Sequence, residues 1–349
     1  LARFSFYENQ YALPLGFTSD RYISGTDWES LTIPRRQEAL MQGIVLEDEQ
    51  AGALAAEGKL KQAEPDFTEK EIRFELRAEG GARILRDDES GVIFQIDGDD
   101  AKIEMIPTDR EETAGCETSV LFTDMRYEPL YGGAQESEEA AKKHYTSTTP
   151  IRIQVKTRRN GETVSSKEVK YPLANNPWGT GRDDFLSCCG YSVEPLKKLQ
   201  LTFSRTGTYT FRDLKIVGQP MDAYPEQAEA LRACTMEEPD LHELPGSGAT
   251  GRITGRINIP GDAGDERNCR ILCIQIPCLD GLTAYVDGKK AELFRADTMF
   301  SGLLLEPGTH EIELRYHTPG LAAGALISVI SWILFLAEGA LSRVFGSAA

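Results

Sequence analysis

Three pairs of adjacent aspartates are the side chains of this sequence best suited to acid–base chemistry: Asp87-Asp88, Asp99-Asp100 and Asp183-Asp184. Enzymes that make or break glycosidic bonds use two carboxyl groups about 5–10 Å apart, one of them as an acid. Each pair, however, lies in a stretch rich in glycine or charged residues, where aspartate commonly stabilises a turn. We therefore interpret all three pairs as turn residues and predict no catalytic residue within this sequence.

The possible metal ligands are scattered. His310 and His317 lie on one predicted strand but at an odd separation, so their side chains point to opposite faces of the sheet. The segment 97–100 (DGDD) lacks the length and the terminal glutamate of an EF-hand calcium loop. The seven cysteines have no zinc-site spacing, and we expect them to be mostly reduced thiols. The sequence thus predicts no metal site and no cofactor; a bound divalent cation is the alternative, which no motif supports.

One loop has the composition of a sugar-binding surface. Trp178 lies in the loop sequence NNPWGTGRDD, together with Asn176, Arg182 and Asp183. An exposed indole can stack on the apolar face of a sugar ring while amide and charged groups bind its hydroxyls. The alternative is that Trp178 anchors the loop by packing into a sheet, and Trp28 allows the same two interpretations.

Composition and patterning indicate a folded, mainly β chain. It has 349 residues, 40% of them hydrophobic, and a formal net charge of −17. This acidic excess argues against nucleic acid as a partner, because phosphate binding requires clustered Lys and Arg. Short alternating runs of polar and apolar residues recur over 71–217 and 252–317, and Asn160-Gly161 and Asp287-Gly288 are typical of two-residue hairpin turns. We predict two antiparallel, jelly-roll-like β-sandwiches.

Residues 321–341, LAAGALISVISWILFLAEGAL, are predicted to form a transmembrane helix. A helix of about 21 residues is roughly 32 Å long, enough to cross a hydrocarbon core of about 30 Å. The alternative is a buried helix of a soluble core, against which stands the absence of any polar stripe at helical spacing. Arg343 after the apolar run weakly favours a cytoplasmic C-terminus.

These patterns divide the chain into parts. Pro34 starts a helix predicted over 33–45, and a second helix is predicted over 223–233. Because the chain begins with Leu1 and has no signal-peptide pattern, we expect it to belong to a longer protein. The predicted parts are a strand and helix segment with a solvated connector (1–66), a first β-sandwich (67–218), a linker helix with a second, membrane-proximal β-sandwich (219–319), a transmembrane helix (320–343) and a short cytoplasmic tail (344–349).

Two groups of short motifs, one near each end of the chain, are similar to those of a known family. They are Tyr7-Glu8-Asn9 and Ala12-Leu13-Pro14, and then Ile276-Pro277, Asp280-Gly281, Val286-Asp287-Gly288-Lys289, Gly302, Pro307-Gly308, His310, Tyr316, Gly324 and Ile327-Ser328. In this order they resemble the YfhO family of bacterial membrane proteins. Leu282 stands where that family usually has Trp; if the Trp binds a ligand, this role is lost here, and if it packs, Leu can replace it.

The resemblance implies a specific activity for the whole protein. YfhO-like proteins look like polytopic glycosyltransferases of the C-type architecture, which move a sugar from an undecaprenyl-phosphate carrier to cell-wall polymers such as lipoteichoic acid. The catalytic residue of such folds lies in an early extracytoplasmic loop, upstream of Leu1. The resemblance therefore implies a bacterial membrane protein in which residues 1–319 are extracytoplasmic and non-catalytic. Its implied partners are the lipid bilayer and a wall polymer or polyprenyl-phosphate sugar.

Two other readings stay open from the sequence. In the first, the chain is a surface scaffold or adhesive module with a membrane anchor and no enzymatic role. In the second, it is a cytosolic protein with a tail anchor, with the orientation reversed. The upstream coding sequence and the side of the membrane reached by the β-sandwiches would separate these readings.

Overall fold

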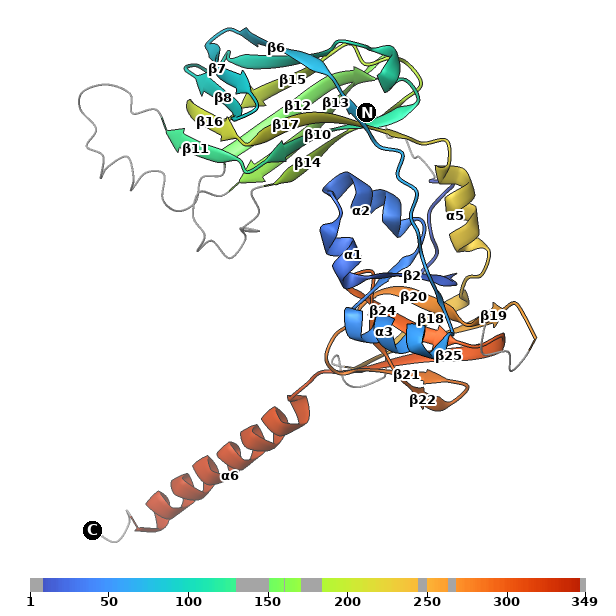
Figure 1. The fold of residues 1–349 in the computed structure, drawn as a ribbon. Coiled ribbons are helices and arrows are strands. Elements are labelled where there is room, and N and C mark those ends of the chain that lie inside the picture. Colours follow the sequence, from blue (N-terminus) through green and yellow to red (C-terminus); the bar gives the residue numbers. More distant parts are fainter. Residues whose placement is uncertain are drawn as a thin grey trace, which may run out of the picture. The chain divides into compact units, whose positions relative to one another are not determined.

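The computed structural model describes residues 9–129, 151–159, 161–170, 184–243, 250–262 and 268–345, and these are mainly β-strands (Figure 1). The chain forms two compact units. Unit 1 comprises Leu1–Leu31, Ala39–Pro65 and Glu226–Ala349, and unit 2 comprises Thr32–Glu38 and Asp66–Pro225. The mainly β fold predicted from the alternating runs is confirmed.

Unit 2 is built from three antiparallel sheets, with strand orders β14-β10-β17-β5, β11-β16-β8-β7 and β13-β12-β15-β9-β6. Their bounds are β5 (Lys70–Ile72), β6 (Phe74–Glu79), β7 (Ala82–Asp88), β8 (Gly91–Ile96), β9 (Lys102–Pro107), β10 (Cys116–Thr123), β11 (Arg126–Pro129), β12 (Ile151–Arg159), β13 (Glu162–Lys170), β14 (Phe185–Ser192), β15 (Leu199–Phe203), β16 (Gly207–Phe211) and β17 (Asp213–Pro220). A short 3₁₀ helix, η1 (Glu111–Thr113), precedes β10.

The core of unit 2 follows from the two-residue period of its strands. Along β12 buried residues alternate with more exposed ones, so that one face packs inward. Phe94, Phe122, Tyr209 and Phe211 are fully buried at the centre. The Phe211 ring makes tilted contacts with those of Phe94 and Phe122. The hairpin predicted between β12 and β13 is confirmed, since the two strands pair up to the residues that flank positions 160 and 161.

Unit 1 contains a seven-stranded sheet, β1-β20-β24-β23-β3-β2-β4, and a five-stranded sheet, β18-β19-β25-β21-β22. Their bounds are β1 (Gly16–Ser19), β2 (Arg21–Ser24), β3 (Ile44–Leu46), β4 (Lys61–Gln62), β18 (Glu237–Glu243), β19 (Thr250–Ile259), β20 (Arg270–Pro277), β21 (Leu282–Val286), β22 (Lys289–Ala291), β23 (Phe294–Ala296), β24 (Phe300–Leu305) and β25 (Gly308–His317). All pairings are antiparallel except those of β2 with β3 and β4.

The N-terminal segment, predicted as a separate part, supplies four strands of the seven-stranded sheet. β1 pairs with β20 in the register Phe17↔Cys273, and β3 meets β23 at Leu46↔Ala296. These strands belong together because their buried faces close one core, which also contains Ile44 and Ile271.

Two local predictions in this segment are wrong. The helix predicted over 33–45 ends at Leu40 as α2 (Ile33–Leu40), because Ile44–Leu46 is fully buried in the sheet as β3. The predicted connector over 49–66 instead contains α3 (Asp48–Glu57), which buries Ala51 and Leu54. A further short helix, α1 (Gly25–Ser30), follows β2. The helix predicted over 223–233 is confirmed as α5 (Tyr224–Arg232).

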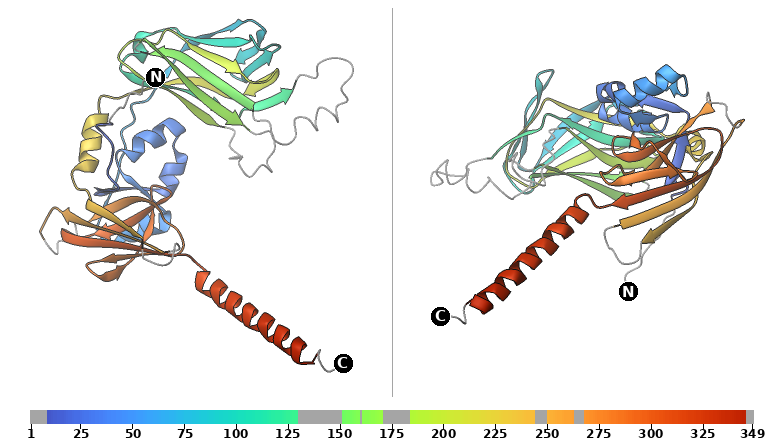
Figure 2. Two further views of the ribbon diagram at one scale, coloured as in Figure 1. Left: turned by 180° about the vertical axis from the view of Figure 1, so that it is seen from behind. Right: turned by 90° about the horizontal axis from the view of Figure 1, so that it is seen from below.

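The last described element is the helix α6 (Leu321–Phe345). Its window Leu321–Glu338 has a mean hydropathy of 2.0 and is not buried against any of the described residues. Figure 2 shows α6 as one uninterrupted helix. By length and composition α6 can cross a bilayer, in agreement with the predicted transmembrane helix. The absence of packing along it also disagrees with a buried core helix.

Candidate functional site

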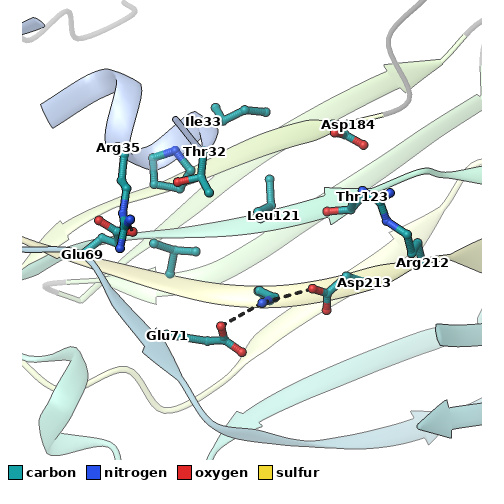
Figure 3. A pocket seen from close by; sticks show the side chains of 13 residues that line it. Thr32, Ile33, Arg35, Glu69, Glu71, Leu121, Thr123, Asp184, Arg212 and Asp213 are labelled. Atoms are coloured by element: carbon teal, nitrogen blue, oxygen red, sulfur yellow. Dashed lines mark hydrogen bonds and ion pairs between the residues drawn. The ribbon is translucent and has the colours of Figure 1, made fainter. Parts of the chain in front are cut away.

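One hollow of unit 2 lies on the outer face of the sheet β14-β10-β17-β5 (Figure 3). Its volume of about 470 Å³ is within the range of small-molecule sites. The N-terminal turn of α2 forms one wall, and β5, β10 and β17 form the floor and the other walls. The lining residues are Thr32, Ile33, Pro34, Arg35, Glu69, Glu71, Leu121, Thr123, Asp184, Arg212, Asp213, Lys215 and Val217. We call this hollow the sheet-face pocket.

Hydrogen bonds fix the α2 wall of the pocket. The buried side-chain amide of Gln219, on β17, donates to the carbonyl of Pro34 at 3.1 Å and approaches Glu38 Oε1 at 3.4 Å. The backbone N–H of Thr68 donates to Glu38 Oε2 at 2.7 Å. The sheet and the segment that leads into β5 therefore both hold the first turns of α2 in place.

The charged side chains of the pocket are largely paired. Lys215 lies between two carboxylates, 2.9 Å from Glu71 and 3.1 Å from Asp213 (Figure 3). The hydrogen bond to Glu71 raises the pKa of Lys215, and Asp213 adds to this effect. Arg35 and Glu69 form a second pair, with Nε and Oε1 2.5 Å apart. Three cations and four carboxylates in total leave the lining close to neutral.

Two side chains of the lining have hydrogen-bonding atoms that no described residue pairs with. Glu69 Oε2 is buried and accepts no hydrogen bond from the described residues. The guanidinium of Arg212 is exposed and makes no hydrogen bond or ion pair with that same part of the chain. A buried acceptor without a donor costs about 1–3 kcal/mol, so a hydroxyl supplied by a ligand or water would be favoured there.

The uncharged part of the lining is apolar with two hydroxyls. Leu121 and Val217 lie on the sheet, and Ile33 lies on α2. Thr32 and Thr123 supply the hydroxyls. Among the described residues that line the pocket there is no His, Cys or Ser. Paired charges around an apolar floor suit the recognition of a polar ligand.

The predicted sugar-binding residues Asn176, Trp178, Arg182 and Asp183 lie outside the described residues. Asp184, which follows Asp183 directly, lines the sheet-face pocket and accepts a 2.8 Å hydrogen bond from the N–H of Asp124.

Asp99 and Asp100 lie in a turn, as predicted, whereas Asp87 lies within β7 and Asp88 ends this strand at the turn that follows. Asp88 Oδ1 accepts from the N–H of Ser90 at 2.8 Å, and Asp100 Oδ1 accepts from the N–H of Gly81 at 3.2 Å. His310 likewise has a structural role at a hairpin end, with its ring nitrogens 2.8 Å from Asp287 Oδ2 and 2.9 Å from a backbone carbonyl. Within the described ranges no three His, Cys, Asp or Glu side chains are placed to hold a metal ion.

Sequence reasoning did not find the charged residues of the pocket. Arg35, Glu69 and Lys215 come from three segments far apart in the chain, so no spacing rule joins them. The one local signal is on β17, where Asp213, Lys215 and Val217 alternate onto one face.

Trp28, for which the sequence allowed two interpretations, is half-buried in the wall of a smaller pocket of unit 1. This pocket has a volume of about 170 Å³. Glu47 and Arg295, 3.1 Å apart, also line it. Trp28 is therefore neither fully buried in the core nor fully exposed.

Comparison with known proteins decides the family. A family model described as "Bacterial membrane protein YfhO" matches residues 2–328. The chain belongs to the YfhO family of bacterial membrane proteins. A YfhO relative from Bacillus subtilis strain 168, itself described as uncharacterized, is 21% identical over 95% of this chain. The chain spans 32% of the length of this YfhO protein.

Solved structures add little to the YfhO assignment. The carbohydrate-binding module CsCBM6-3 from Clostridium stercorarium in complex with cellobiose is 11% identical, over 44% of this chain and 93% of its own, with a TM-score of 0.24. The binding domain of Botulinum Neurotoxin DC in complex with SialylT is 11% identical, over 71% of this chain and 91% of its own, also with a TM-score of 0.24. These scores are too low to establish a shared fold.

Proposed function

We propose that this chain is the extracytoplasmic, non-catalytic β region of a YfhO-family membrane glycosyltransferase, and that its sheet-face pocket binds the carbohydrate of a cell-wall polymer such as lipoteichoic acid. Transfer of the sugar from its undecaprenyl-phosphate carrier takes place in another part of the protein. Residues 1–319 stand on the outer side of the bacterial cell membrane, and α6 crosses the bilayer.

The unsatisfied oxygen of Glu69 carries the proposal for the pocket. Glu69 Oε2 is buried at the pocket wall and lacks a donor among the described residues. Glu69 Oε2 is itself covered, so it accepts from a sugar hydroxyl once the carboxylate turns toward the pocket, and the ring carbons of the sugar then cover Leu121 and Val217. The guanidinium of Arg212, which has no partner among the described residues, can donate to ring or hydroxyl oxygens of the same ligand. These groups favour a ligand with many hydroxyls and no strong charge of its own.

The charge of the chain favours a neutral sugar over the phosphate groups of the polymer. A net charge of −17 repels a polyanion at distances up to about a Debye length, roughly 8–10 Å. The paired charges of the pocket add no large positive field, because four carboxylates accompany its three cations. Recognition of the carbohydrate therefore supplies the specificity, and salt or a divalent cation reduces the repulsion.

Binding of immobilised lipoteichoic acid by the full-length protein, measured by interferometry, tests the pocket. Loss of one charge-assisted hydrogen bond by Arg212→Ala is expected to weaken binding about tenfold. Arg152→Ala, which removes an equally exposed arginine from β12 on another sheet, serves as the matched control and should bind like the wild type. Equal binding by both variants and the wild type rejects the pocket as the carbohydrate site.

The orientation is tested by thiol labelling in intact cells. Val193 is 66% exposed, and a Val193→Cys variant in a Cys188→Ser background places one accessible thiol on unit 2. A membrane-impermeant maleimide should label this thiol before the cells are permeabilised. Labelling only after permeabilisation places unit 2 in the cytosol and rejects the extracytoplasmic proposal. Correct orientation without polymer binding would favour an anchored scaffold instead.

A further inference from the structure

Two apolar side chains at one end of unit 1 are exposed to solvent. Leu279, between β20 and β21, is 56% exposed, and Met299, between β23 and β24, is 52% exposed. Among the side chains of unit 1 whose exposure the structure describes, they are the only large hydrophobic ones before α6 that are exposed. An exposed leucine alone is ordinary, but two exposed apolar side chains at one place call for an explanation.

Backbone hydrogen bonds bring the two loops together. The N–H of Cys278 donates to the carbonyl of Met299 at 2.8 Å, and Pro277 pairs with Phe300 in the ladder of β20 and β24. The carbonyl of Leu279 accepts from the N–H of Leu282 at 3.1 Å, which closes a tight turn. Leu279 and Met299 therefore lie on neighbouring, ordered loops. We call this pair the end patch.

The same end of unit 1 holds the start of α6. The N–H of His317, the last residue of β25, donates to the carbonyl of Gly281 at 2.9 Å, in the turn that follows Leu279. Gly281 is packed so closely that an added Cβ would lie 3.1 Å from Pro319 Cδ. From His317 to Leu321 the chain can extend by at most about 15 Å. The end patch therefore lies no farther from Leu321, the first residue of α6, than this length plus the width of one turn.

We propose that Leu279 and Met299 insert into the interfacial layer of the lipid bilayer and form a second membrane contact beside α6. Once α6 is in the bilayer, Leu321 lies at the membrane surface and the loops tied to His317 lie beside it. At that depth the two apolar side chains move out of water and into contact with lipid acyl chains, which the hydrophobic effect favours. Exposed Asp280, next to Leu279, keeps the insertion shallow because its carboxylate must stay hydrated.

This proposal rests on the membrane-spanning role of α6 but not on the side of the membrane that unit 1 occupies, and it is independent of the sheet-face pocket. The consequence of the second contact is that the orientation of unit 1 relative to the membrane is fixed. The short connector to α6 allows unit 1 to tilt about it, whereas a second contact beside α6 restricts that tilt. Unit 1 would then present a fixed end to the membrane.

Photocrosslinking of the full-length protein in phosphatidylglycerol nanodiscs tests the patch. The photoreactive residue p-benzoylphenylalanine is placed by amber suppression at position 279 or 299, and adducts are identified by mass spectrometry. Leu85 of unit 2 is 56% exposed, as Leu279 is, and serves as the matched control. Leu326 on α6, 61% exposed, serves as the positive control.

The expected result is about tenfold more phospholipid adduct at positions 279 and 299 than at position 85, in keeping with the transfer of a leucine-sized side chain out of water. Lipid adducts at position 326 combined with only protein adducts, or none, at 279 and 299 would overturn the end patch and leave the proposed function intact. No lipid adduct at position 326 would reject the membrane role of α6 and the patch with it. All four positions are exposed, so the substitutions leave the core unchanged.

Discussion

Asp297 and Val45 exchange two hydrogen bonds, one through the aspartate side chain and one through its backbone. The N–H of Val45 donates to Asp297 Oδ1, and the N–H of Asp297 donates to the carbonyl of Val45, both at 2.9 Å. Asp297 has a left-handed backbone with φ of 46°, at the turn between β23 and β24. Its carboxyl group thus joins this turn to β3 inside unit 1.

Burial of this carboxyl group makes the stability of unit 1 depend on pH. Burial raises the pKa of Asp297 to about 6, although the Val45 N–H opposes the shift. Between the ordinary pKa of about 3.8 and about 6 the folded state holds the proton more tightly than the unfolded state. The protonated Asp297 carboxyl group therefore contributes its full stability below a pH of about 3.8, and this contribution is lost as the pH rises through about 6.

We predict that Asp297→Asn removes this loss. Asparagine can accept the Val45 hydrogen bond and tolerates the left-handed backbone. Above the folded pKa the variant should be more stable than the wild type by up to about 3 kcal/mol. Thermal unfolding midpoints of the protein in detergent micelles across this pH range measure the difference. Parallel pH curves for variant and wild type would contradict the prediction.

Asp287→Asn provides a control with the opposite sign. Burial raises the pKa of Asp287, but hydrogen bonds from the Glu311 N–H and His310 outweigh it and leave the pKa below its ordinary value. Asp287 also has a left-handed backbone, with φ of 52°. The contribution of the Asp287 carboxylate to the stability of unit 1 is present above its ordinary pKa and is lost as the pH falls. Asp287→Asn should therefore lower stability at neutral pH, where Asp297→Asn raises it.

Gly281→Ala is predicted to break the junction between β21, β25 and α6. Gly281 has φ of 90°, and a Cβ there would lie 2.1 Å from the carbonyl oxygen of His317. Backbone strain and this clash should together cost about 2–4 kcal/mol. Gly288→Ala is the matched control, because its φ of 76° is similar but no atom lies within 4 Å of the added Cβ. It should cost only about 1–2 kcal/mol.

Urea unfolding compares the two glycine variants, and lipid crosslinking at position 279 reports the effect on the end patch. If the His317 bond holds the patch beside α6, Gly281→Ala should reduce lipid adducts at Leu279, whereas Gly288→Ala should not. Equal stability of the two variants would show that the backbone near Gly281 moves to accommodate the methyl group.

Local patterns predicted the elements of this fold whose cause is local. The alternation along β12, the turn at Asp287-Gly288 and the long apolar run of α6 each depend on residues close together in the sequence. The pairing of β1 with β20 was not predictable in this way, because Phe17 and Cys273 meet only through tertiary packing. The helix α3 was missed because its buried face consists only of the small Ala51 and of Leu54.

The candidate site shows the same limit more strongly. The sequence identifies Asp184 as part of an aspartate pair but does not identify the other residues that line the pocket with it. Arg35 and Glu69 become neighbours only because α2 is fixed against the sheet, and this depends on the buried amide of Gln219. A sequence carries no direct record of such a contact between distant segments.

Arg159 in the core of unit 2 is predicted to be replaceable. It is 4% exposed, and no hydrogen bond partner for its Nε lies in the described part of the chain. Its remaining contacts are with the hydroxyl of Thr118 and, at 3.4 Å, with the carbonyl of Glu194. Burial lowers the pKa of Arg159. A buried cation without a carboxylate partner contributes little net stability.

Arg159→Met, which keeps the length of the side chain, should therefore leave the unfolding free energy unchanged or raise it by about 1–4 kcal/mol. Arg159→Ala should cost about 2–4 kcal/mol, because it leaves a cavity. Urea unfolding of the two variants measures the contrast. If Met were the more damaging replacement, the guanidinium itself would be stabilising, and a bound anion would have to be sought.

Gln219→Leu is predicted to loosen the sheet-face pocket without altering any residue that lines it. Gln219 is 5% exposed, and its amide donates to the carbonyl of Pro34 in the α2 wall. Leucine has a similar size but no donor, so the variant should lose about 1–3 kcal/mol and bind lipoteichoic acid more weakly at temperatures where it is fully folded. Gln154→Leu removes a half-buried amide from β12, on another sheet, together with its hydrogen bond to Ser165, and should leave binding unchanged. If Gln219→Leu binds lipoteichoic acid more weakly while it is fully folded, and Gln154→Leu binds like the wild type, Gln219 is a positioning residue. Unchanged binding despite the loss of stability would show that the wall keeps its place through the Arg35–Glu69 pair.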